Sequence, residues 1–257
     1  MIDLTIENNI AEVVLNAPER LNSLDAASLG ELGVAYDAAA AAGVRALLLR
    51  GEGRAFCAGR DITGVEPERD DAFGFMTDVL TPVLKKMSDF PAPTFAAAHG
   101  ACLGIGLGLL IATDVVYVGT GAKIGSPFAK LGAILDSGGH ALFTERLGAH
   151  RTLDLIYTAE LMSGSDAVAS GLFSRAVPDD EVLAFTREKV AAVADGPTEA
   201  FLASKSLVAS IRDERIGLWE SIAGENRAQG DLAATPDFAE GFRAFQQKRS
   251  PQFRGRS

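Results

Sequence analysis

The chain of 257 residues has little of several features that would place it in common functional classes. Its two cysteines, Cys57 and Cys102, are too few for a disulfide framework, and neither lies in a Cys-x-x-Cys pair or a His/Cys cluster with metal-ligand spacing. No apolar run approaches the roughly 18 residues of a membrane-spanning helix. The first residues also lack the basic flank and apolar stretch of a signal peptide. We therefore expect a cytoplasmic protein with reduced thiols, no metal site and no membrane partner.

Positive charge is scarce as well. The chain has 24 Lys and Arg residues against 34 Asp and Glu residues, a formal net charge of −10, and a pI of about 4.8. This excess of negative charge repels a phosphate backbone, so a nucleic-acid partner is not expected. An anionic small ligand stays open, because local cations or helix N-termini can hold phosphates on an acidic protein. The length and the 47% hydrophobic content allow a sizeable core in one large domain, alone or with a smaller appendage.

Short β-rich runs alternate with helical segments over most of the chain. Residues 4–6 and 10–15 flank a turn-prone Asn8-Asn9 pair and predict a hairpin. Asp25 is a candidate N-cap for a helix that ends near Gly43. Further strands are expected at 44–50, 94–99, 114–118 and 172–177, and further helices at 73–87, 104–112, 138–147, 152–158 and 180–193. This alternation predicts an α/β domain whose sheet is covered on both faces.

The strand pattern stops at Asp195-Gly196-Pro197. The remaining segments, at about 198–211, 215–229 and 236–248, are all typical of helices. We therefore predict a core domain of residues 1–195 and a helical C-terminal region of residues 196–257. In the last helix Phe238, Phe242 and Phe245 share one face, and this apolar stripe needs a surface to cover, for which a neighbouring subunit is one candidate.

Two glycine-rich segments, residues 54–62 and 99–108, each follow a predicted strand. Side by side, such loops could place one backbone N–H from each on a single oxygen, which is the requirement for an oxyanion hole. Spacing alone leaves open the alternative that the glycines at 104, 106 and 108 only permit close helix–sheet packing. A dinucleotide fingerprint is disfavoured, because its third glycine would fall on Leu109 and no acidic residue ends a strand about 20 residues later. A Gly-x-Ser-x-Gly nucleophile elbow is also absent from the sequence.

Four segments in this order resemble signature segments of the crotonase (enoyl-CoA hydratase/isomerase) superfamily. They are residues 18–24 for the CoA-contacting loop, 56–62 and 104–106 for the two oxyanion loops, and 245–253 for the C-terminal segment that closes over CoA. The resemblance implies an α/β fold, a spiral of ββα units with a helical C-terminal oligomerisation region, and trimers commonly paired into hexamers. It also implies an acyl-CoA substrate and no separate cofactor, since CoA is part of the substrate.

The resemblance assigns site residues to this sequence. The oxyanion donors would be the backbone N–H groups of Arg60 and Ile105, with both side chains almost incidental. The residues implied in substrate and CoA binding are Arg20, Leu21, Ala58, Asp61, Ile62, Phe128, Phe245 and Lys248. Simpler alternatives remain: Arg20 and Lys248 as solvated cations, and Asp61 as a side chain that fixes its own loop through backbone hydrogen bonds.

The sequence departs from the hydratases of this superfamily, which use two glutamates to position and deprotonate water. Aligned motifs put Gly108 and Phe128 at those positions, and neither residue can transfer a proton. Asp136 follows, in a Lys-Leu-Gly…Asp-Ser-Gly segment that is most similar to the 1,2-epoxyphenylacetyl-CoA isomerase branch of phenylacetate degradation. A single carboxylate suffices to shift a C=C bond, because it can remove a proton at one carbon and return one at another. The alternative for Asp136 is an N-cap of the following helix, and His140 could reach the pocket or serve as a structural donor.

The leading prediction is therefore an enoyl-CoA isomerase that stabilises a thioester enolate and uses Asp136 as the proton-transfer base. One alternative is a hydratase with a rebuilt water site. Another, from a different class, is an acyl-CoA-binding protein without turnover. The acyl chain and the pathway, including fatty acid metabolism, stay open.

Overall fold

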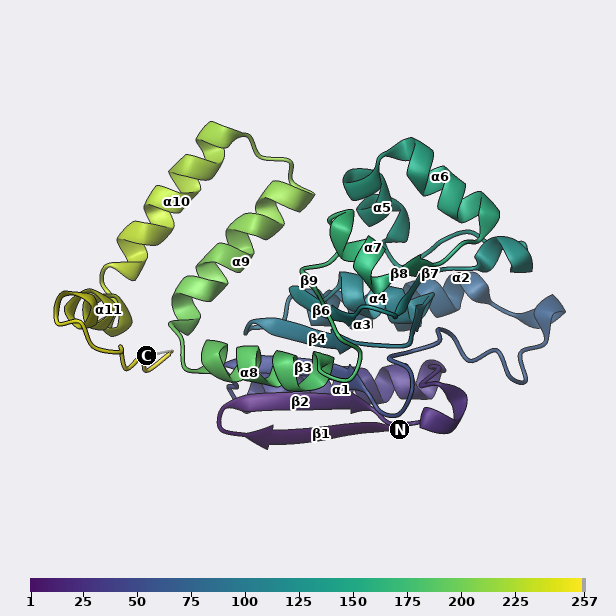
Figure 1. Cartoon of the computed structure of the whole chain (residues 1–257), viewed down its shortest axis with the longest axis horizontal. Helices are drawn as coiled ribbons and strands as arrows, with labels where there is room; N and C mark the ends of the chain where they lie inside the picture. Colours follow the sequence, from purple (N-terminus) through teal and green to yellow (C-terminus); the bar gives the residue numbers. More distant parts are fainter. Residues whose placement is uncertain (256–257) are drawn as a thin grey trace.

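The computed structural model describes residues 1–255, and Figure 1 shows a layered α/β body from which helices project on one side. A six-stranded sheet in the order β1-β2-β3-β4-β6-β9 forms the centre of the body. Its strands are β1 (Ile2–Glu7), β2 (Ile10–Leu15), β3 (Ala46–Gly51), β4 (Thr94–Ala98), β6 (Val115–Gly119) and β9 (Arg175–Val177). The first pair is antiparallel and all later pairs are parallel. Parallel neighbours need crossover connections, which explains the helices between them.

Local sequence signals fix the first elements as predicted. Asn8 and Asn9 have φ angles of 51° and 61°, the left-handed backbone that a tight hairpin turn requires. Helix α1 (Ala26–Ala41) begins after Asp25, whose carboxylate accepts a hydrogen bond from the backbone N–H of Ser28 at 2.8 Å. The predicted hairpin and N-cap are both confirmed.

Helices cover the two faces of the sheet. Successive residues of a strand point to opposite faces, and in β3 Leu47 and Leu49 join one buried cluster while Ala46 and Leu48 join another. The first cluster also includes residues of α1, α3 (Thr81–Ser88) and α4 (Ile105–Ile111). The second is covered by α8 (Val182–Ala194). The prediction of a sheet covered on both faces is therefore confirmed.

The sequence did not predict a second, three-stranded sheet in the order β5-β7-β8. Its strands are β5 (Ala101–Leu103), β7 (Lys123–Gly125) and β8 (Met162–Ser163), and α7 (Gly164–Ala169), also unpredicted, follows directly. Runs of two or three residues carry no readable periodicity. β9 is shorter than the predicted strand 172–177, because residues 172–174 form a bend and pairing with β6 begins at Arg175.

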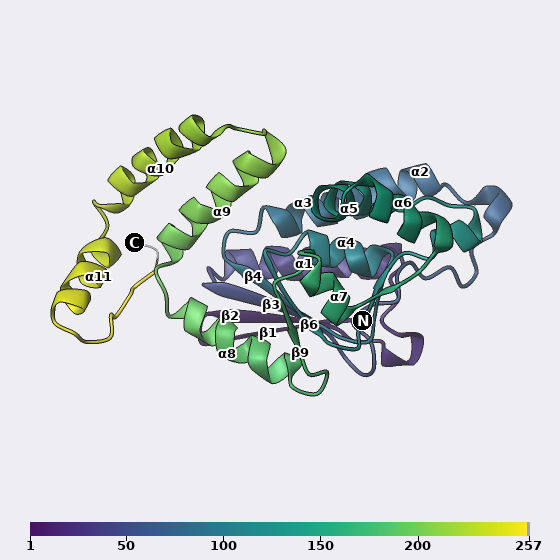
Figure 2. The ribbon, with the colours of Figure 1, turned by 45° about the horizontal axis from the view of Figure 1, so that its top comes forward.

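The remaining helices of the body lie on the same side of the sheet as α4 (Figure 2). The predicted helix 73–87 is a composite of α2 (Ala72–Gly74), a π-helical stretch at Phe75–Leu80, and α3. Helices α5 (Gly139–Leu147) and α6 (Ala149–Thr158) follow the segment that contains Asp136. They lie on the same side of the sheet as α3 and α4 in Figure 2.

Three C-terminal helices stand away from the body in both views (Figures 1 and 2). They are α9 (Thr198–Asp213), α10 (Leu218–Leu232) and α11 (Pro236–Gln246). Arg45 links this region to the body, because its guanidinium donates to the carbonyls of Gly196 at 2.5 Å and Phe253 at 3.4 Å. Large exposed apolar side chains on these helices are Val208, Ile211, Leu218, Trp219, Phe242 and Phe245. In residues 1–255 no helix has the length and apolar character that crossing a membrane requires.

Candidate active site

The first glycine-rich loop leaves β3 and is held between two neighbouring segments. On one side the Cys57 N–H donates to the carbonyl of Ala101 at 2.9 Å, and the Cys57 carbonyl accepts from the N–H of Leu103 at 3.0 Å. On the other side the Ala58 N–H donates to the carbonyl of Leu21 at 2.9 Å. The loop therefore joins β5 to the N-terminal loop that was predicted to contact CoA.

Two glycines bring this loop against the start of α4. Gly59 has φ +109° and Gly104 has φ +52°, conformations that L side chains rarely adopt. A β-carbon on Gly59 would lie 3.1 Å from the carbonyl oxygen of Leu103, and one on Gly104 would lie 2.9 Å from the Phe128 ring. Both positions thus require glycine for the backbone angle and for the close approach.

Each of these glycines precedes a backbone N–H that is free. Within residues 1–255, neither the Arg60 N–H nor the Ile105 N–H donates to a protein acceptor. Leu24 pairs with the residues on either side of Arg60, accepting from the Asp61 N–H and donating to the Gly59 carbonyl, both at 2.9 Å. Successive N–H groups of an extended chain point in opposite directions, so that of Arg60 points away from Leu24. Ile105 is the first residue of α4, where the N–H has no intrahelical acceptor. Two unpaired donors thus come from adjoining segments, the arrangement that can hold one oxygen.

The Arg60 side chain is engaged elsewhere. Its guanidinium donates two hydrogen bonds to the Asp70 carboxylate, at 2.7 and 2.6 Å, and lies 4.0 Å from the centroid of the Phe75 ring. This pairing lowers the pKa of Asp70. The contacts fasten the loop to the 70–75 segment and fit the expectation that Arg60 would contribute its backbone.

Asn22 connects the N-terminal loop to the first glycine-rich loop, a role that the sequence reasoning missed. The side chain is fully buried; its Oδ1 accepts from the Ala17 N–H at 2.8 Å, and its Nδ2 donates to the carbonyls of Glu52 at 2.9 Å and Ala55 at 2.8 Å. The one available signal was the tolerance of Asn for left-handed backbone, here φ 57°. Asn22 therefore sets how the two loops meet.

Arg20 and Asp61, both predicted near CoA, contact each other. Arg20 Nη1 donates to Asp61 Oδ2 at 3.0 Å, and Asp61 Oδ1 accepts from the Thr63 N–H at 2.9 Å. The hydrogen bond from Thr63, followed by the charge of Arg20, lowers the pKa of Asp61. Asp61 thus fixes its own loop, as the simpler alternative stated, while the neighbouring Ile62 side chain is exposed.

Asp136 lies in a tight turn between β7 and α5. Its carboxylate is half-buried and accepts a hydrogen bond from the Ser137 hydroxyl at 2.8 Å. Burial raises the pKa of Asp136, against the opposing effects of the Ser137 hydrogen bond and the charge of His140, which is itself exposed. Helix α5 starts at Gly139 with Gly138 as its N-cap and without a side-chain cap. The alternative that the Asp136 carboxylate caps this helix is therefore wrong.

Of the two positions where hydratases of the superfamily carry glutamate, Gly108 is closed to a side chain and position 128 holds a phenylalanine. A β-carbon at Gly108 would collide with that of Ser137 and come 2.9 Å from its hydroxyl oxygen. The ring of Phe128 packs against Gly104. The packing role that was left open for the glycines also holds at Gly106, where a β-carbon would lie 2.5 Å from the carbonyl oxygen of Cys57.

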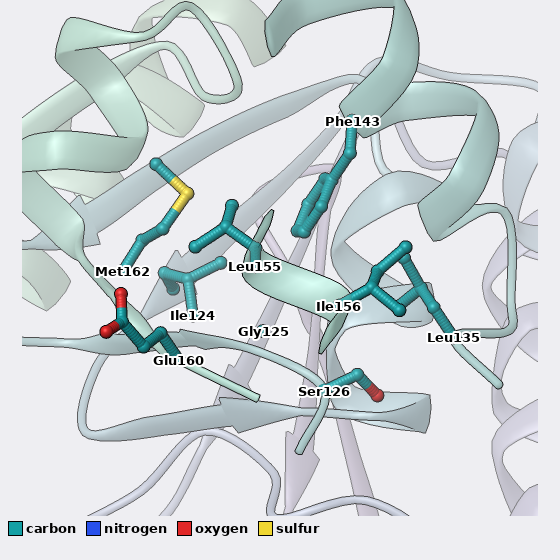
Figure 3. Close-up of a pocket in the computed structure, with 9 residues that line it drawn as sticks. All are labelled: Ile124, Gly125, Ser126, Leu135, Phe143, Leu155, Ile156, Glu160 and Met162. Atoms are coloured by element: carbon teal, nitrogen blue, oxygen red, sulfur yellow. The ribbon is translucent and has the colours of Figure 1, made fainter. Parts of the chain in front are cut away.

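A small, mostly apolar pocket lies beside Leu135, the residue before Asp136 (Figure 3). It is lined by Ile124, Gly125, Ser126, Leu135, Phe143, Leu155, Ile156, Glu160 and Met162. Because Leu135 is part of this lining, the pocket adjoins the turn that carries Asp136. Glu160 is the charged member of this lining.

Phe245 and Lys248 lie apart from the other predicted site residues. Phe245 lies in α11 and Lys248 follows just after it, and α11 stands in the projecting helical region, away from the body that contains α4, in Figures 1 and 2. Phe245 is 86% exposed, while the Phe238 and Phe242 rings pack at a centroid distance of 4.5 Å. Phe245 is therefore exposed in a single chain, and the closing of residues 245–253 over CoA stays a prediction.

An α/β body with two touching glycine loops and a projecting helical region is the crotonase fold. The Enoyl-CoA hydratase/isomerase family model matches residues 5–256. The chain is 34% identical over 252 residues to a protein of Rhodobacter capsulatus named "Probable enoyl-CoA hydratase", covering 98% of this chain and 96% of that protein. The chain belongs to the enoyl-CoA hydratase/isomerase family.

Two further comparisons bear on the branch and the fold. The 1,2-epoxyphenylacetyl-CoA isomerase of Escherichia coli is 31% identical over 265 residues, covering 98% of this chain and 97% of the relative. The crystal structure of an enoyl-CoA hydratase from Bacillus anthracis superimposes with a TM-score of 0.89 at 26% identity, covering 99% of each chain. Most of the similar proteins carry hydratase names, so the likeness does not single out the epoxyphenylacetyl-CoA isomerase branch.

Proposed function

We propose that the protein is an enoyl-CoA isomerase that shifts a double bond, or rearranges a ring, in an acyl-CoA thioester, with Asp136 as the proton-transfer base. The backbone N–H groups of Arg60 and Ile105 hold the thioester oxygen. Arg20, Leu21, Ala58, Asp61, Ile62 and Phe128 form the near side of the CoA and acyl site.

The chemistry requires two groups. The Asp136 carboxylate takes a proton from C2 of a 3-enoyl thioester, and the electron pair moves onto the thioester oxygen to give a dienolate. The two N–H groups stabilise that negative charge. The protonated Asp136 then returns a proton at C4, the double bond settles between C2 and C3, and the carboxylate is regenerated. No water is added and none is lost.

The observation that carries this proposal is the isolation of the Asp136 carboxylate from the backbone. Several aspartates of this chain accept backbone N–H hydrogen bonds that hold local structure, as Asp25, Asp71, Asp114 and Asp237 do. In the described residues 1–255, the Asp136 carboxylate accepts a hydrogen bond from the Ser137 hydroxyl alone. A half-buried carboxylate without a structural partner, with its pKa raised by burial, is suited to exchange a proton with a substrate.

The same packing argues against the ordinary hydratase arrangement. Hydration would need a carboxylate pair to hold and deprotonate water, and Ser137 fills the space beside Gly108 where one of them would stand. Hydratase activity remains the competing function, because most of the similar proteins carry that name.

Two parallel assays separate these functions. With 3-hexenoyl-CoA, an isomerase forms the conjugated 2-enoyl thioester and its absorbance rises. With crotonyl-CoA, a hydratase removes the conjugated double bond and the absorbance falls. A rise in the first assay without a fall in the second supports the proposal. A fall in the second without a rise in the first overturns it, and binding of both substrates without any change would indicate an acyl-CoA-binding protein.

We also propose that the protein works as a homo-trimer or hexamer in the cytoplasm, with residues 196–257 as the assembly region of a 1–195 core. Exposed apolar side chains along α9, α10 and α11 support this. In such an assembly Phe245 and Lys248 would reach the nucleotide end of CoA in a neighbouring subunit, since they lie far from the loops of their own chain.

A further inference from the structure

We propose that Ser137 is the positioning residue for Asp136: its hydroxyl orients the carboxylate, and its β-carbon occupies the volume that a side chain at position 108 would need. This inference rests on the proposed role of Asp136 and adds the residue that makes that role possible. No resemblance or comparison assigned a function to Ser137.

The first support is the backbone conformation. Ser137 has φ 54°, in the left-handed region that residues other than glycine adopt uncommonly. It is followed by Gly138 at φ 88°, and the Asp136 carbonyl accepts from the Gly139 N–H at 2.8 Å. A strained residue persists only where its surroundings hold it, and such residues cluster at functional sites. Glycine or asparagine would fit this backbone with less strain, so a serine at this position has a conformational cost.

The second support is the contact between the turn and α4. The Ser137 β-carbon sits directly over Gly108, where no other side chain can fit, and a β-carbon on Gly138 would touch the Ile111 side chain at 3.4 Å. The turn is therefore seated on the helix that begins with the free Ile105 N–H. This seating fixes the distance between the base and the proposed oxyanion donors.

The third support is the hydrogen bond itself. The Ser137 hydroxyl donates to Asp136 Oδ1 at 2.8 Å and leaves Oδ2 without a hydrogen bond among residues 1–255. A carboxylate held by one oxygen presents the other in a defined direction. The hydroxyl also opposes the effect of burial on the pKa of Asp136, and so does the charge of His140 from α5. From α4, the packed residues Gly108 and Ile111 bring no titratable group.

The test uses Ser137→Ala, which keeps the β-carbon over Gly108 and removes the hydroxyl alone. The Asp136 carboxyl is followed by carbon NMR in protein labelled at aspartate, with Asp136→Asn identifying its signal. We expect the Asp136 titration to move to higher pH, because the hydrogen bond that favours the charged form is lost. An unchanged titration would overturn the inference, and this readout does not depend on turnover.

The second readout is kinetic, with 3-hexenoyl-CoA as the probe. We expect the activity ratio of wild type to Ser137→Ala to be at least about threefold larger on the acid side of the profile than at high pH, with KM nearly unchanged. A purely structural role would lower activity equally at every pH. Ser163→Ala is a control that removes another Ser–Asp hydrogen bond, to Asp166 at 2.7 Å, together with the N-cap of α7, and it should leave the Asp136 titration where it was.

The two proposals fail in different ways. If Asp136→Asn keeps its activity, the proposed function fails. If Asp136→Asn is inactive while Ser137→Ala leaves both the titration and the pH profile unchanged, the role of Ser137 fails alone.

Discussion

The β-carbon of Ser137 occupies the space that a side chain at Gly108 would need. The position of Ser137 therefore requires a glycine at 108. The glycine admits the turn that carries Asp136, and the turn excludes a carboxylate from that position on α4. This relationship links the missing glutamate and the additional aspartate as two consequences of one packing arrangement.

We expect Gly108→Ala to destabilise the protein by about 1–3 kcal/mol and to lower activity, because the added methyl forces the Asp136 turn away from α4. Thermal unfolding and 3-hexenoyl-CoA turnover measure the two effects. Gly230→Ala is the control: nothing lies within 4 Å of a β-carbon there, and Gly230 is inside α10, so this change should stabilise slightly.

The double variant Gly108→Ala/Ser137→Gly should recover most of the stability lost in Gly108→Ala, because the colliding atom is gone. Strictly additive effects of the two changes would contradict the proposed contact.

Asp136→Asn should lower isomerisation by about 10²–10⁴-fold while acyl-CoA affinity stays within a few-fold, because the carboxylate moves protons and does not hold CoA. Steady-state kinetics and a binding titration with a non-reactive acyl-CoA measure both. Asp154→Asn makes the same chemical change at an exposed position on α6 and should be neutral. If Asp136→Asn keeps more than a tenth of wild-type activity, Asp136 is not the base and its role is structural.

Activity should fall on the acid side as Asp136 takes up a proton, since only the ionised carboxylate can act as a base. Burial raises the pKa of Asp136, so this limb should lie above the ordinary range of aspartate and be absent from any residual activity of Asp136→Asn. A pH–rate profile of kcat is the measurement. A limb that persists unchanged in the Asn variant would belong to another group.

Ile105→Pro removes one proposed oxyanion N–H and should reduce activity about 10²–10³-fold. Because Ile105 is the first residue of α4, where proline is tolerated, the helix itself should survive, and circular dichroism checks this. Ile105→Ala keeps the N–H and is the matched control.

Arg60→Ala likewise keeps its N–H and should retain most activity, although the hydrogen bonds to Asp70 are lost. An inactive Arg60→Ala variant would mean that the guanidinium itself contacts the substrate.

Truncation after Asp231 should lower the oligomeric state and weaken CoA-ester binding together, because it removes the Phe238, Phe242 and Phe245 stripe along with Lys248. Phe242→Ser/Phe245→Ser, with most of the helix surface intact, tests the stripe alone, as burying each ring contributes roughly 1.5–3 kcal/mol. Light scattering and an acyl-CoA titration are the measurements. A wild-type monomer, or a truncated protein with normal affinity, would contradict the assembly proposal.

Local signals allowed much of the fold to be predicted. The Asn8-Asn9 turn, the Asp25 cap and a strand near residues 44–50 are properties of neighbouring residues, and each was predicted correctly. Strands β5, β7 and β8 are defined by partners distant in sequence, so their short runs gave no periodicity.

The residues of the candidate site likewise fall into those that the local sequence could predict and those that it could not. The glycine loops and Asp136 stand out by composition and motif. For Asp61, the hydrogen bond from the Thr63 N–H supports the simpler alternative that it fixes its loop, and its part in CoA binding stays a prediction. Asn22 and Ser137 act through contacts that only the folded chain creates: one buried between two loops, the other seated on a helix. The exposed placement of Phe245, far from its own loops, could not be derived from the helical spacing of the stripe.

Hydrogen exchange at the substrate carbons in deuterium oxide tests the central claim most directly. Wild-type protein incubated with 3-hexenoyl-CoA should introduce deuterium at C4 of the 2-enoyl product, and at C2 of recovered substrate, as followed by proton NMR, while Asp136→Asn should introduce none above the uncatalysed background. Deuterium at both carbons that depends on Asp136 is the predicted result. Product formed by wild type with deuterium at neither carbon would mean that Asp136 passes the proton directly from C2 to C4. Exchange or product formation that continues undiminished in Asp136→Asn would contradict the account.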